Sequence, residues 1–275
     1  MNHRVLGRTG WQVSEIACGT YDSFHAPGDR GRRHVLALMQ ENLTAGVNLF
    51  DSAPMYGLSE ANIGFAAPQL SASGMADYLV ATKVLQSDRK GAIDQIERSF
   101  RVLGGRIDLL QIHNMAGWRK VLPYLVELKA QGRIRATGVT DYRCSSFREI
   151  EAAIVTGDVD VIQIPYNLME REAESRLIPL ARERNIGVLV MTPICPLSGR
   201  RELLNRLRRV ELSPYQEFGV RDAGGLCLKW LLSKAPEGIL LPATSRVERV
   251  RSNTAVSGTP DFPPDELKRL EQAIG

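Results

Sequence analysis

The chain has 275 residues, of which 44% are hydrophobic and 24% are charged, and its formal net charge is +4. This length suits a single α/β barrel, which takes about 250 residues, and the hydrophobic share allows a large core beneath a polar surface. The charge is too small, and Lys and Arg are too scattered, for a nucleic-acid-binding protein. A slightly positive chain still suits a phosphorylated small molecule as its ligand.

The four cysteines indicate a reducing environment. Cys18, Cys144, Cys195 and Cys227 form no CxxC pair and have no histidine at a spacing suited to zinc. Isolated cysteines of this kind are typical of reduced thiols in a cytosolic protein, and we expect no metal site. The first residues form no apolar stretch like that of a signal peptide, and no apolar run approaches the roughly 20 residues that span a membrane. We therefore predict a cytoplasmic protein with no membrane or nucleic-acid partner.

The first predicted element is a small β-hairpin over Val5–Val13, with Arg8-Thr9-Gly10 at its turn. Eight short runs rich in Val, Ile and Leu follow, and their nearly continuous hydrophobicity is typical of parallel strands buried on both faces. We predict these strands at Glu15–Tyr21, Val47–Ala53, Tyr78–Val84, Ile107–Asn114, Ile134–Thr140, Val159–Tyr166, Gly187–Ile194 and Gly238–Thr244.

Amphipathic stretches separate the predicted strands. In Ile93–Leu103, for example, apolar residues recur every three or four positions, as on a helix that packs one face against a core. Strand and helix alternate with a repeat of about 30 residues, which is the pattern of a parallel α/β fold. We therefore predict parallel strands with helices between them.

The number of strands favours a closed barrel over an open sheet. Eight strands suit a (β/α)₈ TIM barrel, whereas an open doubly wound sheet normally carries a GxGxxG turn after its first strand. Here the first strand leads into Gly19-Thr20-Tyr21, which lacks that pattern. We predict one barrel domain over residues 1–275. The connection Cys195–Phe218 is longer than the repeat requires, and its basic part, Arg200–Arg209, predicts a helix within a lid or binding loop.

Three successive strands are predicted to end in ionisable side chains. Asp51, Lys83 and His113 each close an apolar run, and Tyr56 follows shortly after Asp51. One such residue is most simply a polar group where a strand meets solvent. Three of them indicate a site, because active sites of barrel enzymes lie at the carboxyl ends of the strands.

Elementary electrostatics suggests roles for these side chains. A buried Lys83 needs a carboxylate partner, which Asp51 can supply, because desolvating either charge alone costs several kcal/mol. A nearby ammonium favours the phenolate form of a tyrosine, so we expect the pKa of Tyr56 to be lowered. Tyr56 would then be a competent general acid near neutral pH.

Three motifs resemble the aldo-keto reductase family. The run from Asp51 to Glu60, DSAPMYGLSE, is similar to the family signature DxAxxYGxSE. The segments ATK at 81–83 and LQIHN at 110–114 resemble the lysine and histidine motifs of the family, in the same order. The resemblance extends from the LGRTG segment at 6–10 to the ERVRSN segment at 248–253, which is nearly the whole chain.

This resemblance implies a catalytic tetrad of Asp51, Tyr56, Lys83 and His113. A nicotinamide cofactor would deliver hydride to a carbonyl carbon while Tyr56 protonates the oxygen. Lys83, held by Asp51, would tune the pKa of Tyr56, and His113 would orient the carbonyl by hydrogen bonding. The implied activity is the NADPH-dependent reduction of an aldehyde or ketone to an alcohol.

The same resemblance implies which residues contact the nicotinamide end of the cofactor. Gly19, Thr20 and Tyr21 match the end of the first strand, beside the nicotinamide and pyrophosphate, and Asp51 lies with them. Gln163 matches the residue that holds the carboxamide. The full set on this side of the implied site is Gly19, Thr20, Tyr21, Asp51, Thr140, Asp141, Gln163, Met191 and Thr192.

Two of these positions depart from the family pattern. Thr140-Asp141 stands where the family usually has Ser-Asn, and an Asp cannot donate the hydrogen bond that an Asn amide would. Met191 stands where an aromatic residue often stacks on the nicotinamide, although a thioether can also pack against a ring face. We expect Met191 to be a weaker platform.

The segment after the last strand resembles the part of the family that binds the adenosine phosphate. Arg249 matches the arginine that holds the 2′-phosphate, Asn253 matches an adenine contact, and Thr244 is expected to assist. Some members have a Lys where this chain has Ala243, so one phosphate partner is absent. The resemblance therefore implies NADPH as the preferred cofactor, with NADH usable.

Two other functions are compatible with parts of this pattern. A non-catalytic NADP-binding regulatory subunit would share the fold, but an intact tetrad argues against it. A barrel aldolase would use Lys83 to form a Schiff base, but a neighbouring Asp51 would keep that amine charged and non-nucleophilic.

Overall fold

The computed structural model describes residues 1–235 and 237–274. It contains a two-stranded antiparallel hairpin followed by eight parallel strands. The hairpin pairs β1 (His3–Val5) with β2 (Gln12–Ser14), and a 3₁₀ turn at Gly7–Thr9 joins them. The parallel strands are β3 (Cys18–Gly19), β4 (Leu49–Asp51), β5 (Leu79–Val84), β6 (Leu109–His113), β7 (Ala136–Thr140), β8 (Val161–Pro165), β9 (Gly187–Met191) and β10 (Gly238–Leu240).

Each parallel strand pairs with the next one along the chain, and the first meets the last. Parallel bridges join Ile16 to Leu240 and Gly19 to Ala243, and Gly19 N donates to Pro242 O at 3.0 Å. The sheet therefore closes, and the predicted (β/α)₈ barrel with its N-terminal hairpin is confirmed. The first strand is shorter than predicted because its outer residues make only isolated bridges to the last strand.

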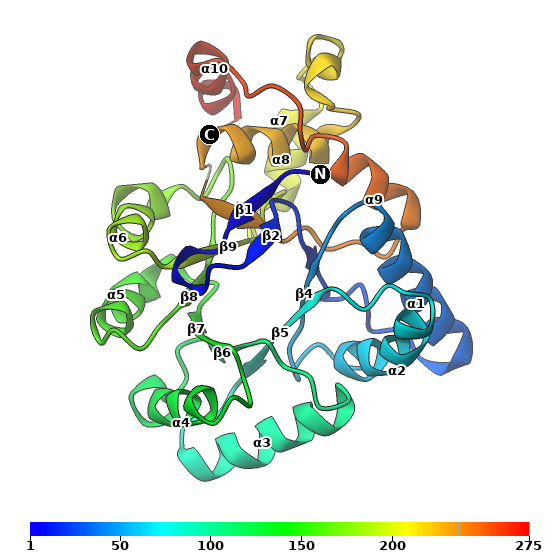
Figure 1. The fold of residues 1–275 in the computed structure, drawn as a ribbon. Helices are drawn as coiled ribbons and strands as arrows, with labels where there is room; N and C mark the ends of the chain where they lie inside the picture. The colour runs from blue at the N-terminus through cyan, green and yellow to red at the C-terminus, as the bar shows by residue number, and fades with distance from the viewer. Residues whose placement is uncertain (236, 275) are drawn as a thin grey trace.

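Helices follow the strands and surround the barrel (Figure 1). Asp88 and Asp222 begin α3 and α8 as N-caps, because each carboxylate accepts a hydrogen bond from a backbone N–H of the first turn. The helices that follow successive strands are α1 (Gly28–Thr44), α2 (Ser59–Ala72), α3 (Arg89–Val102), α4 (Trp118–Ala130), α5 (Phe147–Val155), α6 (Leu177–Glu183), α8 (Ala223–Lys234) and α9 (Val247–Thr254).

Two further helices lie outside this repeat. The predicted basic helix is present as α7 (Arg200–Leu207), within the long connection between β9 and α8. The chain continues beyond α9 into α10 (Pro264–Ile274), which packs against α7 and α8. Among the described residues, no helix combines the length and hydrophobicity that crossing a membrane requires.

Alternation along the strands divides the core into two apolar clusters. Leu49, Ala81, Leu109 and Val161 belong to a cluster inside the barrel, together with Leu6 and Val13 of the hairpin region. The residues that follow them, such as Phe50 and Leu110, face outward and pack with the helices. Because side chains alternate along a strand, the residues two positions after each inward residue also point inward. These are Asp51, Lys83, Gln111 and Gln163.

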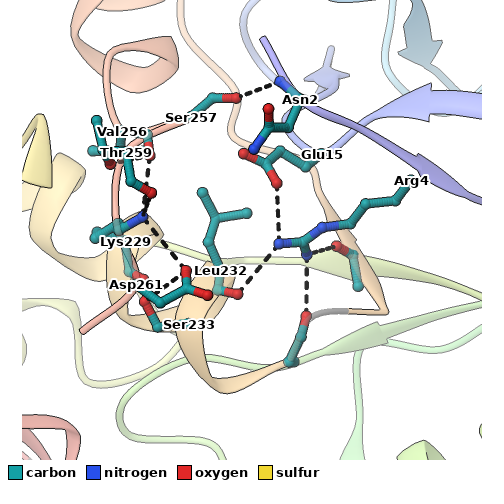
Figure 2. A network of polar contacts seen from close by, with 12 residues as sticks. Asn2, Arg4, Glu15, Lys229, Leu232, Ser233, Val256, Ser257, Thr259 and Asp261 are labelled. Atoms are coloured by element: carbon teal, nitrogen blue, oxygen red, sulfur yellow. Dashed lines mark hydrogen bonds and ion pairs between the residues drawn. The ribbon is translucent and has the colours of Figure 1, made fainter. Parts of the chain in front are cut away.

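A polar network anchors the hairpin at the amino-terminal end of the barrel (Figure 2). Arg4 of β1 donates to the carbonyl oxygens of Leu232 and Gly238, and it forms an ion pair with Glu15 at 3.1 Å. Lys229 of α8 is buried; its Nζ donates to Thr259 O at 2.9 Å and lies 3.6 Å from Asp261 Oδ1. The hairpin therefore closes this end of the barrel, and the opposite end, where the strands terminate, is left for a site.

Candidate active site

The structure brings the four predicted catalytic side chains together at the carboxyl ends of β4, β5 and β6. Lys83 Nζ donates to Asp51 Oδ2 at 2.7 Å and to Ser52 O at 2.7 Å. The same ammonium nitrogen lies 4.9 Å from the centre of the Tyr56 ring. The His113 ring stands edge-on to Tyr56, with the ring centres 6.0 Å apart.

A tight turn between β4 and α2 holds Tyr56 over this pair. Ser59 at the start of α2 donates its hydroxyl to Tyr56 O at 2.8 Å. Gly57 has φ +63°, and a Cβ at this position would lie 2.2 Å from His25 Nδ1, so only glycine is suited here. The same His25 nitrogen accepts a hydrogen bond from Leu58 N at 3.0 Å. The backbone on both sides of Tyr56 is therefore fixed.

Burial and charge act in opposite directions on Lys83 and Tyr56. Burial disfavours the charged form of Lys83, but Asp51 and Tyr56 outweigh it and raise the pKa of the ammonium. Burial raises the pKa of Tyr56, and the opposing effect of Lys83 does not overcome it. The prediction of a lowered Tyr56 pKa was therefore wrong, because it considered charge without burial. Tyr56 keeps its proton at neutral pH, as a proton donor must.

His113 lies beside Tyr56 as a neutral imidazole. Burial is the main cause that lowers the pKa of His113 to about 4, and the positive charge of Lys83 adds to it. Its Nδ1 is buried and has no hydrogen-bond partner among residues 1–235 and 237–274. A neutral ring can offer one N–H to a carbonyl oxygen without adding a second positive charge to the site.

Several buried hydroxyls around the same mouth also lack partners. Within the described ranges, Thr20 Oγ1, Thr140 Oγ1 and Thr192 Oγ1 make no hydrogen bond. Thr192 also has φ +50°, which is unusual for a β-branched residue. Buried polar groups are normally hydrogen-bonded, and exceptions in a native structure require an explanation. A polar ligand that lies across these strand ends would satisfy them, so the residues present fit the predicted cofactor.

The residues predicted beside the nicotinamide frame this mouth. Thr20 is buried after β3, and Tyr21 is 60% exposed with its ring edge-on to Tyr56 at 5.1 Å. Gly19 lies at the junction with β10, where a Cβ would come within 3.0 Å of Leu241 O. Met191, at the end of β9, is half-buried.

Asp141 is not free to face a cofactor alone, because an arginine holds it. Its buried carboxylate accepts hydrogen bonds from the backbone N–H of Arg143 at 2.9 Å, from Nε at 3.0 Å and from Nη2 at 2.8 Å. Burial opposes ionisation of Asp141, but the hydrogen bonds from Arg143 prevail and lower its pKa. The Asp that departs from the family pattern is thus accompanied by its own counter-ion.

We expect Arg143→Ala to lower the free energy of unfolding at pH 7 by about 1–3 kcal/mol, the usual cost of leaving a buried polar group without its partner. Because the folded-state pKa of Asp141 is depressed, the stability from this pair is present at neutral pH and decreases as pH falls through that pKa. Urea unfolding at pH 7 and in acid measures both effects. Arg148→Ala, an exposed arginine on α5, is the control, and equal losses in the two variants would contradict the assignment.

Gln163 points into the barrel beneath the tetrad and is already engaged there. Its Nε2 donates to Asp51 Oδ2 at 3.2 Å, and its Oε1 accepts from Gln111 Nε2 at 2.9 Å. Any contact with a carboxamide would therefore use its remaining hydrogen-bonding capacity. Gln111 lies within the histidine motif, but the resemblance to the family implies no role for it. The two-residue alternation of a strand would have placed it inward with His113.

The predicted phosphate-binding residues lie on and before α9. Arg249 is exposed on this helix, and Asn253 is buried one turn later. Thr244 Oγ1 accepts a hydrogen bond from Arg246 N at 3.1 Å in the loop that leads into the helix. In the part of the chain that the structure describes, Arg249 forms no ion pair, whereas Arg251 on the same helix is paired with Glu41. The Arg249 guanidinium is therefore available for an anion.

The chain is similar to a known protein family. The model of the aldo/keto reductase family matches residues 15–274. This chain belongs to the aldo/keto reductase family. It is therefore an oxidoreductase that depends on a nicotinamide cofactor.

The relatives of this aldo/keto reductase align over nearly its whole length. An NADH-specific methylglyoxal reductase of Escherichia coli strain K12 is 27% identical over 307 residues, which cover 91% of each chain. An aldo/keto reductase of Klebsiella pneumoniae, solved with NADP and acetate, has a TM-score of 0.83 at 19% identity and covers 100% of this chain and 96% of that one. A glycerol dehydrogenase of Gluconobacter oxydans has a TM-score of 0.76 at 22% identity, with 98% and 94% covered. The two solved structures show the same fold.

The structure of this aldo/keto reductase also places Trp118 and the four cysteines. Trp118 of α4 is buried and donates its Nε1 to Glu149 of α5 at 2.6 Å. It therefore supports the helices. Cys18 and Cys227 are buried free thiols, and Cys144 and Cys195 are partly buried and also unpaired. Within residues 1–235 and 237–274, no group of three or more His, Cys, Asp or Glu side chains is arranged to hold a metal ion.

Proposed function

We propose that this aldo/keto reductase uses NADPH to reduce an aldehyde or ketone to the corresponding alcohol, with Tyr56 as the proton donor. The observation that carries the proposal is the position of a protonated Tyr56 above the buried Lys83–Asp51 pair, with neutral His113 at its edge. The bound nicotinamide would supply the hydride.

The side chains of the tetrad divide the remaining work. Tyr56 gives its hydroxyl proton to the carbonyl oxygen as negative charge develops there. The Lys83 ammonium, 4.9 Å from the ring, stabilises the phenolate that remains, because an opposite charge at this range favours the ionised form. Asp51 keeps Lys83 in place and balances its charge. The neutral His113 orients the same carbonyl oxygen by a hydrogen bond.

Two features support the choice of a reductase over the alternatives. The complete tetrad would serve no purpose in a non-catalytic regulatory subunit. The ammonium of Lys83 is held by Asp51 at 2.7 Å, and its pKa is raised. A Schiff-base lysine must be a free amine, so an aldolase is disfavoured.

Exposed apolar side chains around the mouth favour an apolar or aromatic carbonyl compound. Tyr21, Met55, Tyr142 and Leu197 lie in the loops that follow β3, β4, β7 and β9, and each is 45–60% exposed. Exposed apolar groups gathered in this way are typical of a binding site. The test is NADPH oxidation, followed by absorbance, across a panel of aromatic aldehydes, aliphatic ketones and sugars. Absence of turnover with every carbonyl compound would reject the reductase and leave the regulatory subunit.

We expect the Arg249→Ala variant to lose its preference for NADPH. A guanidinium suits the 2′-phosphate, and a charged hydrogen bond contributes about 1.5–3 kcal/mol, so the KM for NADPH should rise about tenfold to a hundredfold while that for NADH hardly changes. Steady-state kinetics with both nucleotides measures this.

Arg251→Ala is the matched control for Arg249→Ala, because Arg251 lies on the same helix but is paired with Glu41. It should leave the nucleotide preference intact. A parent enzyme that prefers NADH, or an Arg249→Ala variant with undiminished preference for NADPH, would show that the phosphate binds elsewhere.

A further inference from the structure

A closed ring of hydrogen bonds lies inside the barrel beneath the tetrad. Gln111 of β6 is fully buried, and its Nε2 lies 3.2 Å from Asp51 Oδ1 and 2.9 Å from Gln163 Oε1. Gln163 of β8 completes the ring, with its Nε2 3.2 Å from Asp51 Oδ2. The three side chains come from β4, β6 and β8, and alternate strands of a barrel place their inward side chains in one layer.

The chemistry of the ring determines which way each amide points. A carboxylate only accepts hydrogen bonds, so both glutamines must turn their NH₂ groups toward Asp51. Rotating either amide by half a turn would set its oxygen against a carboxylate oxygen. Gln111 then offers its second N–H to Gln163 Oε1, as observed. The orientation of Gln111 is therefore unique, although its side chain is an amide.

The neighbouring strand leaves room for this side chain. A Cβ at Gly138 of β7 would lie 2.8 Å from Gln111 Cγ, a separation at which one of the two groups would have to move. The Oε1 of Gln111 is buried without a hydrogen-bond partner among residues 1–235 and 237–274. The packing therefore accommodates a polar side chain at position 111, and the side-chain hydrogen bonds described for it come from its NH₂ group.

We propose that Gln111 is a positioning residue for the tetrad, which holds Oδ1 of Asp51 so that Oδ2 stays on Lys83 beneath Tyr56. Without this contact, Asp51 Oδ1 has no hydrogen-bond donor among the described residues, and the carboxylate is held at Oδ2 alone, by Lys83 and Gln163, so that it can tilt about its side-chain bond. The ammonium of Lys83 would follow it and leave its position below the phenol ring. This inference rests on the proposed reductase activity.

Two variants of Gln111 separate a positioning role from a packing role. Gln111→Met keeps the length of the side chain and removes the amide, and we expect kcat/KM to fall about tenfold to a hundredfold, as for a lost hydrogen bond to a charged group. The Kd for NADPH, from fluorescence titration, should change by no more than about fivefold, because the loss on the cofactor side is the hydrogen bond from Gln111 to Gln163 Oε1, a neutral contact of about 1 kcal/mol. Gln111→Glu places a second carboxyl beside Asp51, and activity should recover as pH falls, because a protonated carboxyl can again donate.

A second readout does not depend on turnover. The Nζ signals of the buried Lys83 and Lys229 can be followed by NMR in protein labelled with ¹⁵N-lysine, and Lys83→Met assigns the first. In Gln111→Met we expect the Lys83 signal to shift or broaden, while that of Lys229, at the other end of the barrel, stays unchanged. Gln95→Met, which removes another glutamine hydrogen bond, to Leu85 N, is the control for general loss of packing.

The possible outcomes are distinguishable. If the parent enzyme reduces no carbonyl compound, the proposed function fails, and the Lys83 signal alone decides the positioning role. If the parent is active and Gln111→Met keeps both parent kcat/KM and an unchanged Lys83 signal, the positioning role is overturned. A Gln111→Glu variant with the same pH dependence as Gln111→Met would also overturn it.

Discussion

Tyr56→Phe should lower the rate of carbonyl reduction by about 10²–10⁴-fold, which is the usual contribution of a positioned general acid. The ring stays, so its contacts with Tyr21 and His113 are kept, and only the hydroxyl group that carries the proton is lost. Because hydride transfer needs a proton for the oxygen, kcat falls while the Kd for NADPH is nearly unchanged. Steady-state kinetics and fluorescence titration of the cofactor measure the two quantities separately.

Tyr21→Phe is the matched control for this prediction, since Tyr21 carries a phenol at the same mouth, its ring is edge-on to Tyr56, and it is 60% exposed. Tyr21→Phe should keep kcat within about threefold of the parent value. The reason is that the Lys83 ammonium lies against the ring of Tyr56, not against that of Tyr21. A Tyr56→Phe enzyme as active as the parent, or a Tyr21→Phe enzyme with the larger loss, would remove Tyr56 from the role of acid.

Lys83→Met should damage both folding and catalysis. It leaves Asp51 as a buried carboxylate without a cation, and breaking a buried pair in this way costs about 3–5 kcal/mol in the free energy of unfolding. It also removes the charge that stabilises the Tyr56 phenolate, so kcat should fall by at least about 10²-fold. Urea unfolding and steady-state kinetics on the same preparation measure the two losses.

The double variant Asp51→Asn/Lys83→Met distinguishes the two effects. With no uncompensated charge in the barrel, it should regain about 1–3 kcal/mol of the lost stability, but activity should not return. Lys229→Met removes the other fully buried lysine, far from the mouth, and should lower stability while kcat/KM is retained. Recovery of activity in the double variant would mean that Lys83 serves only to neutralise Asp51.

The barrel, and the meeting of Asp51, Tyr56, Lys83 and His113 at one end of it, could be predicted from the sequence because they depend on local patterns. Asp51, Lys83 and His113 each terminate an apolar run, and parallel strands bring such residues to one end of a barrel. The first strand was predicted over Glu15–Tyr21 but is regular only at Cys18–Gly19, because the pairing that closes the barrel joins residues more than 200 positions apart.

The features of the site that could not be predicted depend on quantities that the spacing of residues does not contain. The direction of the Tyr56 pKa shift is a balance between burial and the Lys83 charge, and no spacing of residues gives their relative size. Arg143 is two positions from Asp141, and nothing in that spacing distinguishes a counter-ion from a solvated arginine. The inward register of Gln111 could have indicated that it lies in the site. Its partner Gln163, however, is 52 residues away, and the family resemblance implies for Gln163 only a contact with the cofactor.

The apolar layer above the hairpin has a consequence for the proposed proton donor. In the proposed reaction Tyr56 would give away a proton in each turnover and recover it from water. Leu6, Leu49, Leu109 and Leu189 are fully buried in the barrel below the tetrad, and these side chains separate the tetrad from the bulk solvent beneath. We therefore expect reprotonation of Tyr56 from the mouth, on the side where Tyr21 is exposed. In the proposed reaction, product departure and proton recovery would share this opening, so the proton would return to Tyr56 only after the alcohol has moved aside.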